Sequence, residues 1–169
     1  AGAIFDPARW MACIAAFVAM GLTASGTYLI NDLLDLEADR QHWTKRNRPF
    51  AAGVIGIPHG ILAAGALLSV GSVAAAVGAG LPVVALLALY CAVTLSYSLH
   101  LKRVPVLDVT ILASLFTLRL VLGAAAGDVP ISSWLLVFSM FLFLSLALAK
   151  RSTEIGRKSA TTADHGRGY

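Results

Sequence analysis

Five long apolar stretches dominate the sequence and restrict the folds that it can adopt. They cover residues 8–30, 58–79, 81–99, 105–126 and 131–149. Each approaches or reaches the roughly 20 residues that an α-helix needs to cross about 30 Å of hydrocarbon. In that layer the backbone polar groups must be bonded internally, which a helix achieves. The sequence therefore predicts an all-α fold: a polytopic bundle of five transmembrane helices in a single domain.

The composition supports this prediction. Apolar residues make up 58% of the chain and charged residues 13%, whereas soluble domains have about half and about a quarter. The net charge of +4 does not indicate a nucleic-acid partner, because the basic residues fall in short segments between the apolar stretches. Cys13 and Cys91 lie inside apolar stretches without a second cysteine or histidine at metal-ligand spacing, which predicts packing roles.

The basic residues predict how the helices are oriented in the membrane. Only Arg9 falls on one side of the membrane, and only Arg119 lies within an apolar stretch. The other side holds Arg40, Lys45, Arg46, Arg48, Lys102, Arg103, Lys150, Arg151, Arg157, Lys158 and Arg167. The excess of positive charge on cytoplasmic segments predicts that this side faces the cytoplasm, in the plasma membrane. Residues 31–40, 97–103 and 150–154 then converge on one membrane face.

The first apolar stretch runs into an acidic segment at its end. If the helix continues, Asp32, Asp35 and Asp39 lie within about a 60° arc, with Glu37 on the far side. Like charges at this spacing repel one another, so a cation is expected on that face. Mg²⁺ suits it, because this ion takes one or two carboxylates and completes its shell with water and phosphate oxygens. The sequence predicts a magnesium site here; the alternative is a solvated acidic helix end.

Polar residues near the same membrane face are candidates for binding phosphate groups. Arginine binds anionic oxygens bidentately, and lysine acts as a point charge. The alternatives are that the basic residues only set the topology, and that residues 150–154 form a positively charged helix end with an internal ion pair. The candidates are Asn31, Lys45, Arg46, Arg48, Tyr97, Lys102, Arg103, Lys150, Arg151 and Glu154.

Two charged residues stand on the fourth apolar stretch. Asp108 and Arg119 are eleven residues apart, which is about three turns, or roughly 16 Å, and nearly the same helix face. A charge that faces lipid costs at least about 2.5 kcal/mol on insertion scales, so both should point into the bundle. Both are candidate substrate-binding residues; the alternative is a structural role.

A resemblance to a known family rests on the acidic segment and on two short runs of sequence after it. The run N-D-x-x-D-x-x-x-D, then K-R-x-R-P and A-A-G, resembles the UbiA superfamily of membrane prenyltransferases. This resemblance implies a fold of about nine helices, of which these five look like the second to the sixth. It therefore implies a fragment of a longer protein. It also implies that Asp32, Asp35 and Asp39 bind Mg²⁺ and a diphosphate.

Two departures from the aromatic prenyltransferases resemble one branch of that superfamily. Where those enzymes carry a second aspartate-rich motif, this sequence reads A-K-R-S-T-E. The spacing from Tyr97 to Lys102 is one residue longer than the corresponding Tyr-to-Lys spacing in those enzymes. Both resemble the decaprenyl-phosphate phosphoribosyltransferases. The resemblance then implies transfer of 5-phosphoribose from phosphoribosyl diphosphate to a polyprenyl phosphate.

Two other functions stay open on the residues. One is transfer of a polyprenyl group from polyprenyl diphosphate to an aromatic acceptor, with Asp108 near the acceptor carbon. The other is a membrane transporter or lipid-binding scaffold, in which Arg119 would mark a translocation path. A scaffold gives no reason for three carboxylates on one arc at a helix end.

Overall fold

The computed structural model describes the backbone of residues 6–101 and 106–165, and the side chains as far as residue 153. The chain forms α1 (Pro7–Leu34), the short α2 (Leu36–Gln41), α3 (Ile57–Gly78), α4 (Leu81–Leu99), α5 (Leu107–Ala126) and α6 (Ser133–His165). A short 3₁₀ turn, η2, covers Lys45–Asn47. Helices α1, α3, α4, α5 and the Ser133–Thr153 part of α6 are long and apolar enough to span a membrane. The predicted all-α bundle is confirmed.

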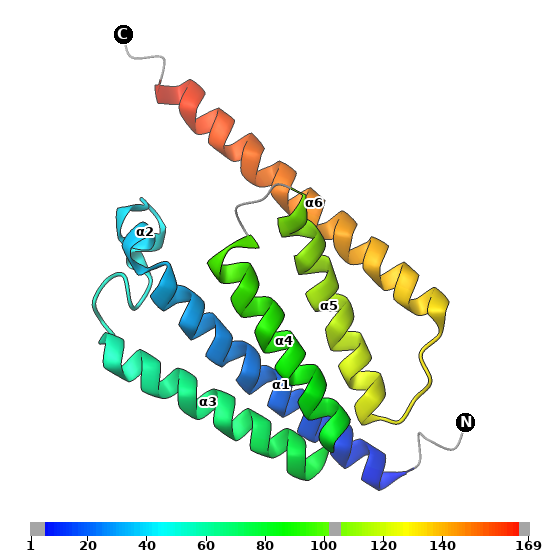
Figure 1. Ribbon diagram of the computed structural model, residues 1–169. Coiled ribbons are helices and arrows are strands. Elements are labelled where there is room, and N and C mark those ends of the chain that lie inside the picture. The colour runs from blue at the N-terminus through cyan, green and yellow to red at the C-terminus, as the bar shows by residue number, and fades with distance from the viewer. Residues whose placement is uncertain (1–5, 102–105, 166–169) are drawn as a thin grey trace.

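Helix α1 lies at the centre of the bundle and contacts α3, α4 and α5 (Figure 1). Helix α6 packs along α5 and leaves most of its apolar surface exposed. Helix α3 lies close against α1 because small residues face each other between them. A Cβ atom on Gly71 would stand 2.9 Å from Thr23 Oγ1, and one on Gly26 would stand 3.0 Å from Leu68 Cγ. Close packing through small residues is typical of helices in membranes.

Helices α3 and α4 form a helical hairpin with a very short connection. Helix α3 ends at Gly78, and α4 begins at Leu81 with Pro82 in its first turn. Gly80 has φ +87°, a conformation that glycine adopts without steric cost. Proline is tolerated in the first turn of a helix because the N–H that it lacks would have no partner within the helix.

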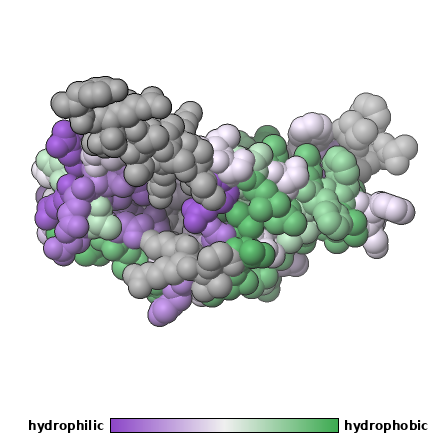
Figure 2. All heavy atoms as spheres, turned by 90° about the horizontal axis from the view of Figure 1, so that it is seen from above, coloured by the Kyte–Doolittle hydropathy of each residue, from purple (hydrophilic) through white to green (hydrophobic). Residues whose placement is uncertain are grey.

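The polar segments lie at one end of the bundle. Helix α2, the end of α4 and the start of α5 all lie at the upper end in Figure 1, and α6 passes the same level. Viewed from that end, hydrophilic residues gather on the side of α2 and the segment after it, while hydrophobic residues cover the opposite flank (Figure 2).

The other end of the bundle is held by Arg9. Its Nη1 atom donates hydrogen bonds to the carbonyl oxygens of Gly127 and Asp128 at 3.3 and 3.2 Å. Its Nη2 atom is 3.3 Å from the Asp128 carboxylate. These contacts tie the start of α1 to the α5–α6 connection.

Candidate active site

The acidic segment forms the junction between α1 and α2. The Asp35 N–H donates to the Asn31 carbonyl at 2.9 Å, and the Asp39 N–H donates to the Asp35 carbonyl at 2.8 Å. The helical path therefore continues almost as the sequence predicts, but it breaks at Asp35, where α1 ends and α2 begins. Glu37 is exposed, whereas Asp39 is buried.

An arginine from the following segment lies between two of the aspartates. Arg48 Nη1 is 2.9 Å from Asp32 Oδ1 and 2.8 Å from Asp39 Oδ2. Lys45 Nζ is 3.8 Å from the other oxygen of Asp39, whose side chain is 4% exposed. Hydrogen bonds between ionised groups at these distances are roughly twice as strong as neutral ones. A cation therefore does meet the acidic face, and in this structure it is a guanidinium.

The segment that carries Arg48 is anchored by Phe50. The Phe50 side chain is buried, and its ring lies directly over Gly60 of α3. A Cβ atom on Gly60 would stand 2.5 Å from Phe50 Cε1 and 3.4 Å from Leu33 Cδ1. Gly60 thus makes the space in which Phe50 packs. Because Arg48 and Phe50 are two residues apart, this contact holds the guanidinium over the acidic helix end.

The carboxylates at the α1–α2 junction provide fewer metal ligands at one place than they would in a continuous helix. Within the described residues, no three His, Cys, Asp or Glu side chains are grouped so that they could hold a metal ion. The turn at Asp35 departs from the regular helix that aligns the three aspartates. Asp32 and Asp39 nevertheless converge on one nitrogen atom of Arg48. Mg²⁺ commonly takes one or two carboxylates from a protein, so the chemistry of this pair is compatible with the ion.

Asp108 and Arg151 join two further polar segments. Asp108 is buried, as expected from its place in an apolar stretch. Its Oδ1 atom accepts a hydrogen bond from the Val109 N–H at 2.7 Å, and its Oδ2 atom is 3.9 Å from Arg151 Nε. The ion pair brings the 150–154 segment of α6 to the start of α5. The neighbouring Lys150 is exposed.

The remaining candidates differ in how much the structure says about them. Asn31 and Tyr97 are half-buried near the ends of α1 and α4, and Arg46 is exposed. Lys102, Arg103 and the side chain of Glu154 lie outside the described residues.

Arg119 points into the bundle, as the sequence predicts. Its Nη2 atom donates a 2.7 Å hydrogen bond to the hydroxyl of Tyr90, a buried residue of α4. The guanidinium carbon lies 5.4 Å from the centroid of the Tyr90 ring and 5.0 Å from that of Phe116. Cation–π contacts of this kind stabilise a charge more strongly when the charge is shielded from water. The role of Tyr90 was missed from the sequence, where this residue is one more member of an apolar stretch.

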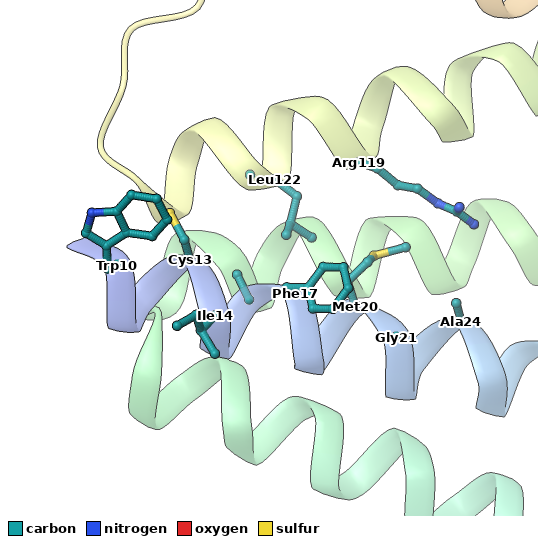
Figure 3. Close-up of a pocket in the computed structure, with 11 residues that line it drawn as sticks. Trp10, Cys13, Ile14, Phe17, Met20, Gly21, Ala24, Arg119 and Leu122 are labelled. Carbon is teal, nitrogen blue, oxygen red and sulfur yellow. The ribbon is translucent and has the colours of Figure 1, made fainter. Parts of the chain in front are cut away.

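A cavity of about 620 Å³ lies between α1 and α5. Arg119 is the charged member of its lining, and the other lining side chains are mostly apolar (Figure 3). Sequence reasoning did not predict this cavity, because it depends on which helices pack together. Its lining includes Trp10, Ile14, Phe17, Met20, Gly21, Leu122 and Gly123.

In the part of the chain that the structure describes, five helices are long and apolar enough to span a membrane, and carboxylates and cations cluster at one end of them. These features are those of a multi-pass membrane protein with a polar site at one membrane face. The model of the UbiA prenyltransferase family matches residues 1–160, and the chain belongs to this family. The family supports a transferase rather than the transporter or scaffold that the residues left open.

Three relatives illustrate the similarity. A decaprenyl-phosphate phosphoribosyltransferase of Mycolicibacterium smegmatis is 42% identical over 88% of this chain and 46% of its own length. An enzyme of the same name from Corynebacterium glutamicum is 38% identical over 92% of this chain and 47% of its own length. The uncharacterized protein y4nM of Sinorhizobium fredii is 48% identical over 90% of this chain and 30% of its own length. The chain thus spans less than half the length of these relatives.

Proposed function

We propose that the full-length protein transfers 5-phosphoribose from phosphoribosyl diphosphate to a polyprenyl phosphate in the membrane. The observation that carries this proposal is the 38–42% identity to two decaprenyl-phosphate phosphoribosyltransferases over nearly the whole chain. The cations around the acidic helix end support it, because a donor with three phosphate groups and a phosphorylated acceptor both demand positive charge.

In this proposal the donor diphosphate binds where Arg48 now lies. Asp32 and Asp39, with Asp35 as the third candidate ligand, would hold the metal. A bound Mg²⁺ would supply the positive charge and Lewis acidity that make the diphosphate a better leaving group. In that state Arg48 would donate its hydrogen bonds to phosphate oxygens, and Lys45 would add a second positive charge.

The reaction itself requires few further contributions from protein side chains. The bond between C1 of the ribose and the diphosphate oxygen breaks, and C1 becomes oxocarbenium-like, as in glycosyl transfer. A phosphate oxygen of the lipid acceptor forms the new bond to C1. This oxygen is already anionic, so no catalytic base is required. An aromatic acceptor would instead want a carboxylate near its reacting carbon, for which Asp108, 3.9 Å from Arg151, is the candidate.

We predict that membranes containing the full-length protein convert radiolabelled phosphoribosyl diphosphate and polyprenyl phosphate into a lipid-extractable product. Replacing both Lys150 and Arg151 with Ala should raise an apparent Michaelis constant roughly ten- to a hundredfold, because a charge-assisted contact of about 1.5–3 kcal/mol is lost. The magnesium requirement should stay the same. If a prenyl diphosphate with an aromatic acceptor yields product and phosphoribosyl diphosphate does not, the proposal is wrong.

The proposed site faces the cytoplasm, and cysteine labelling tests this. Thr44 lies after α2 and Asp128 lies at the other end of the bundle, and both side chains are exposed. We expect an impermeant maleimide to label Thr44→Cys only from the cytoplasmic side and Asp128→Cys only from the opposite side, because basic segments stay in the cytoplasm. Reversed labelling would place the acidic cluster outside the cell, away from a cytoplasmic sugar-phosphate donor.

A further inference from the structure

We infer that Arg119 binds the phosphate of the isoprenoid lipid substrate while the adjoining part of its chain occupies the cavity between α1 and α5. This inference rests on the proposed function for the identity of the lipid, and it assigns the place where that lipid binds. The cavity, the state of the guanidinium and its position relative to the aspartates support it.

The guanidinium is arranged to receive an anion. It carries five N–H donors, and its hydrogen bond to Tyr90 uses one of them. Its Nε atom is buried without a hydrogen-bond partner. Among the described residues no carboxylate forms an ion pair with it. Ionisable groups inside a membrane usually pair with an opposite charge, so a bound anion would complete this site.

The cavity next to Arg119 suits a hydrocarbon chain. Its volume of about 620 Å³ lies within the roughly 300–1,000 Å³ of ligand pockets. Ile14, Phe17 and Leu122 contribute apolar walls, and Gly21 and Gly123 leave the two facing helices open. Phe17 is 80% exposed, so the cavity opens on the surface of these five helices. A lipid chain can therefore enter it from that side, with a few isoprene units inside.

The guanidinium lies at the end of the cavity that is nearer the aspartates. In Figure 3 the Arg119 side chain runs towards the level of Ala24, while Trp10 stands at the other end of the cavity. Arg119 also interacts with Tyr28 of α1. Tyr28 precedes Asp32 by four residues, a rise of about 6 Å along the helix. A phosphate bound by Arg119 would therefore lie between the hydrocarbon chain and the acidic cluster.

These features favour a single-chain phosphate over a membrane phospholipid. The cavity is one slot between two helices, and its polar end offers a single cation. A phospholipid brings two chains and a glycerol backbone, whereas an isoprenoid phosphate brings one chain that ends in the anion. Free phosphate would gain nothing from the apolar walls.

Binding measurements on the purified full-length protein in detergent test the inference. The probes are farnesyl phosphate, farnesol, inorganic phosphate and phosphatidylglycerol. We expect farnesyl phosphate to bind at least tenfold more tightly than each of the others. Arg119→Gln should weaken farnesyl phosphate binding roughly ten- to a hundredfold, because a charge-assisted contact is lost, and should leave farnesol binding unchanged. Arg119→Lys should retain part of the preference.

A second variant tests the cavity without touching the charge. Gly123→Leu fills the cavity from α5, where a Cβ atom would meet nothing within 4 Å, and should weaken farnesyl phosphate and farnesol alike. Gly65→Leu is the matched control, because Gly65 has the same free space but lies on α3. This control should leave the binding of both lipids unchanged.

Three results would overturn the inference: equal weakening of farnesol and farnesyl phosphate by Arg119→Gln, no effect of Gly123→Leu, or equally tight binding of phosphatidylglycerol. The binding test needs no turnover, so it is separate from the proposed reaction. Absence of phosphoribosyl transfer alongside Arg119-dependent binding would contradict the proposed function alone. Intact transfer without that dependence would contradict the inference alone.

Discussion

Replacing Asp39 with Asn in the full-length protein is expected to lower magnesium-dependent transfer by at least about a hundredfold. Asp39 is the most buried of the aspartates in the acidic segment, and it shares Arg48 Nη1 with Asp32. Even groups that only orient a metal ligand typically contribute about 10- to 100-fold, so loss of a ligand should exceed this range. Asn keeps the shape of the side chain and removes its charge. The measurement is the initial rate across a magnesium titration.

Glu37→Gln is the matched control for Asp39→Asn. Glu37 lies two residues earlier on the same short helix and is exposed, so its rate should stay within about threefold of the wild type. Equal losses in the two variants would contradict the assignment of the metal to one face of the α1–α2 junction. An unchanged magnesium dependence in Asp39→Asn would show that Asp39 serves only to hold Arg48.

Replacing Gly60 with Leu is expected to lower the free energy of unfolding by about 1–3 kcal/mol, the usual cost of overpacking. Its new Cβ atom would meet the buried ring of Phe50, and the segment that carries Arg48 would be displaced. Thermal unfolding of the full-length protein measures the loss. The transfer rate should fall in the same variant.

Two comparisons isolate the contact between Gly60 and Phe50. Gly65→Leu lies on the same helix, and its Cβ would have nothing within 4 Å, so this change should not destabilise the protein. In the double variant Gly60→Leu with Phe50→Ala, the smaller side chain relieves the clash. The two changes should therefore be non-additive by at least about 0.5 kcal/mol. Strict additivity would mean that Phe50 does not pack against Gly60.

The bounds of the predicted transmembrane segments agree with those of the observed helices to within a few residues, except at the C-terminal end of α6. The third apolar stretch, 81–99, has the same bounds as α4. The last helix departs most, because it continues to His165, well beyond the predicted end at residue 149. The polar residues of α6 that follow the apolar stretch can extend into water. The length of the apolar stretch therefore does not predict where this helix ends.

The candidate site was predicted in part. The burial of Asp108 and the inward direction of Arg119 follow from the cost of a charge in lipid, a property of each residue alone. The contact of Arg48 with Asp32 and Asp39 was not predicted. It depends on the path of the segment before α3, and that path depends on the packing of Phe50 over Gly60.

The sequence by itself determined that this chain crosses the membrane as a helical bundle and that carboxylates and cations gather near one end of it. The physical reason is local: a helix must be long enough to cross the hydrocarbon layer, and charges collect where water is available. Only the tertiary structure decided that Arg48 lies between two aspartates and that Arg119 lines an apolar cavity between α1 and α5. Those contacts join residues far apart in the sequence, and they exist only once the helices have packed.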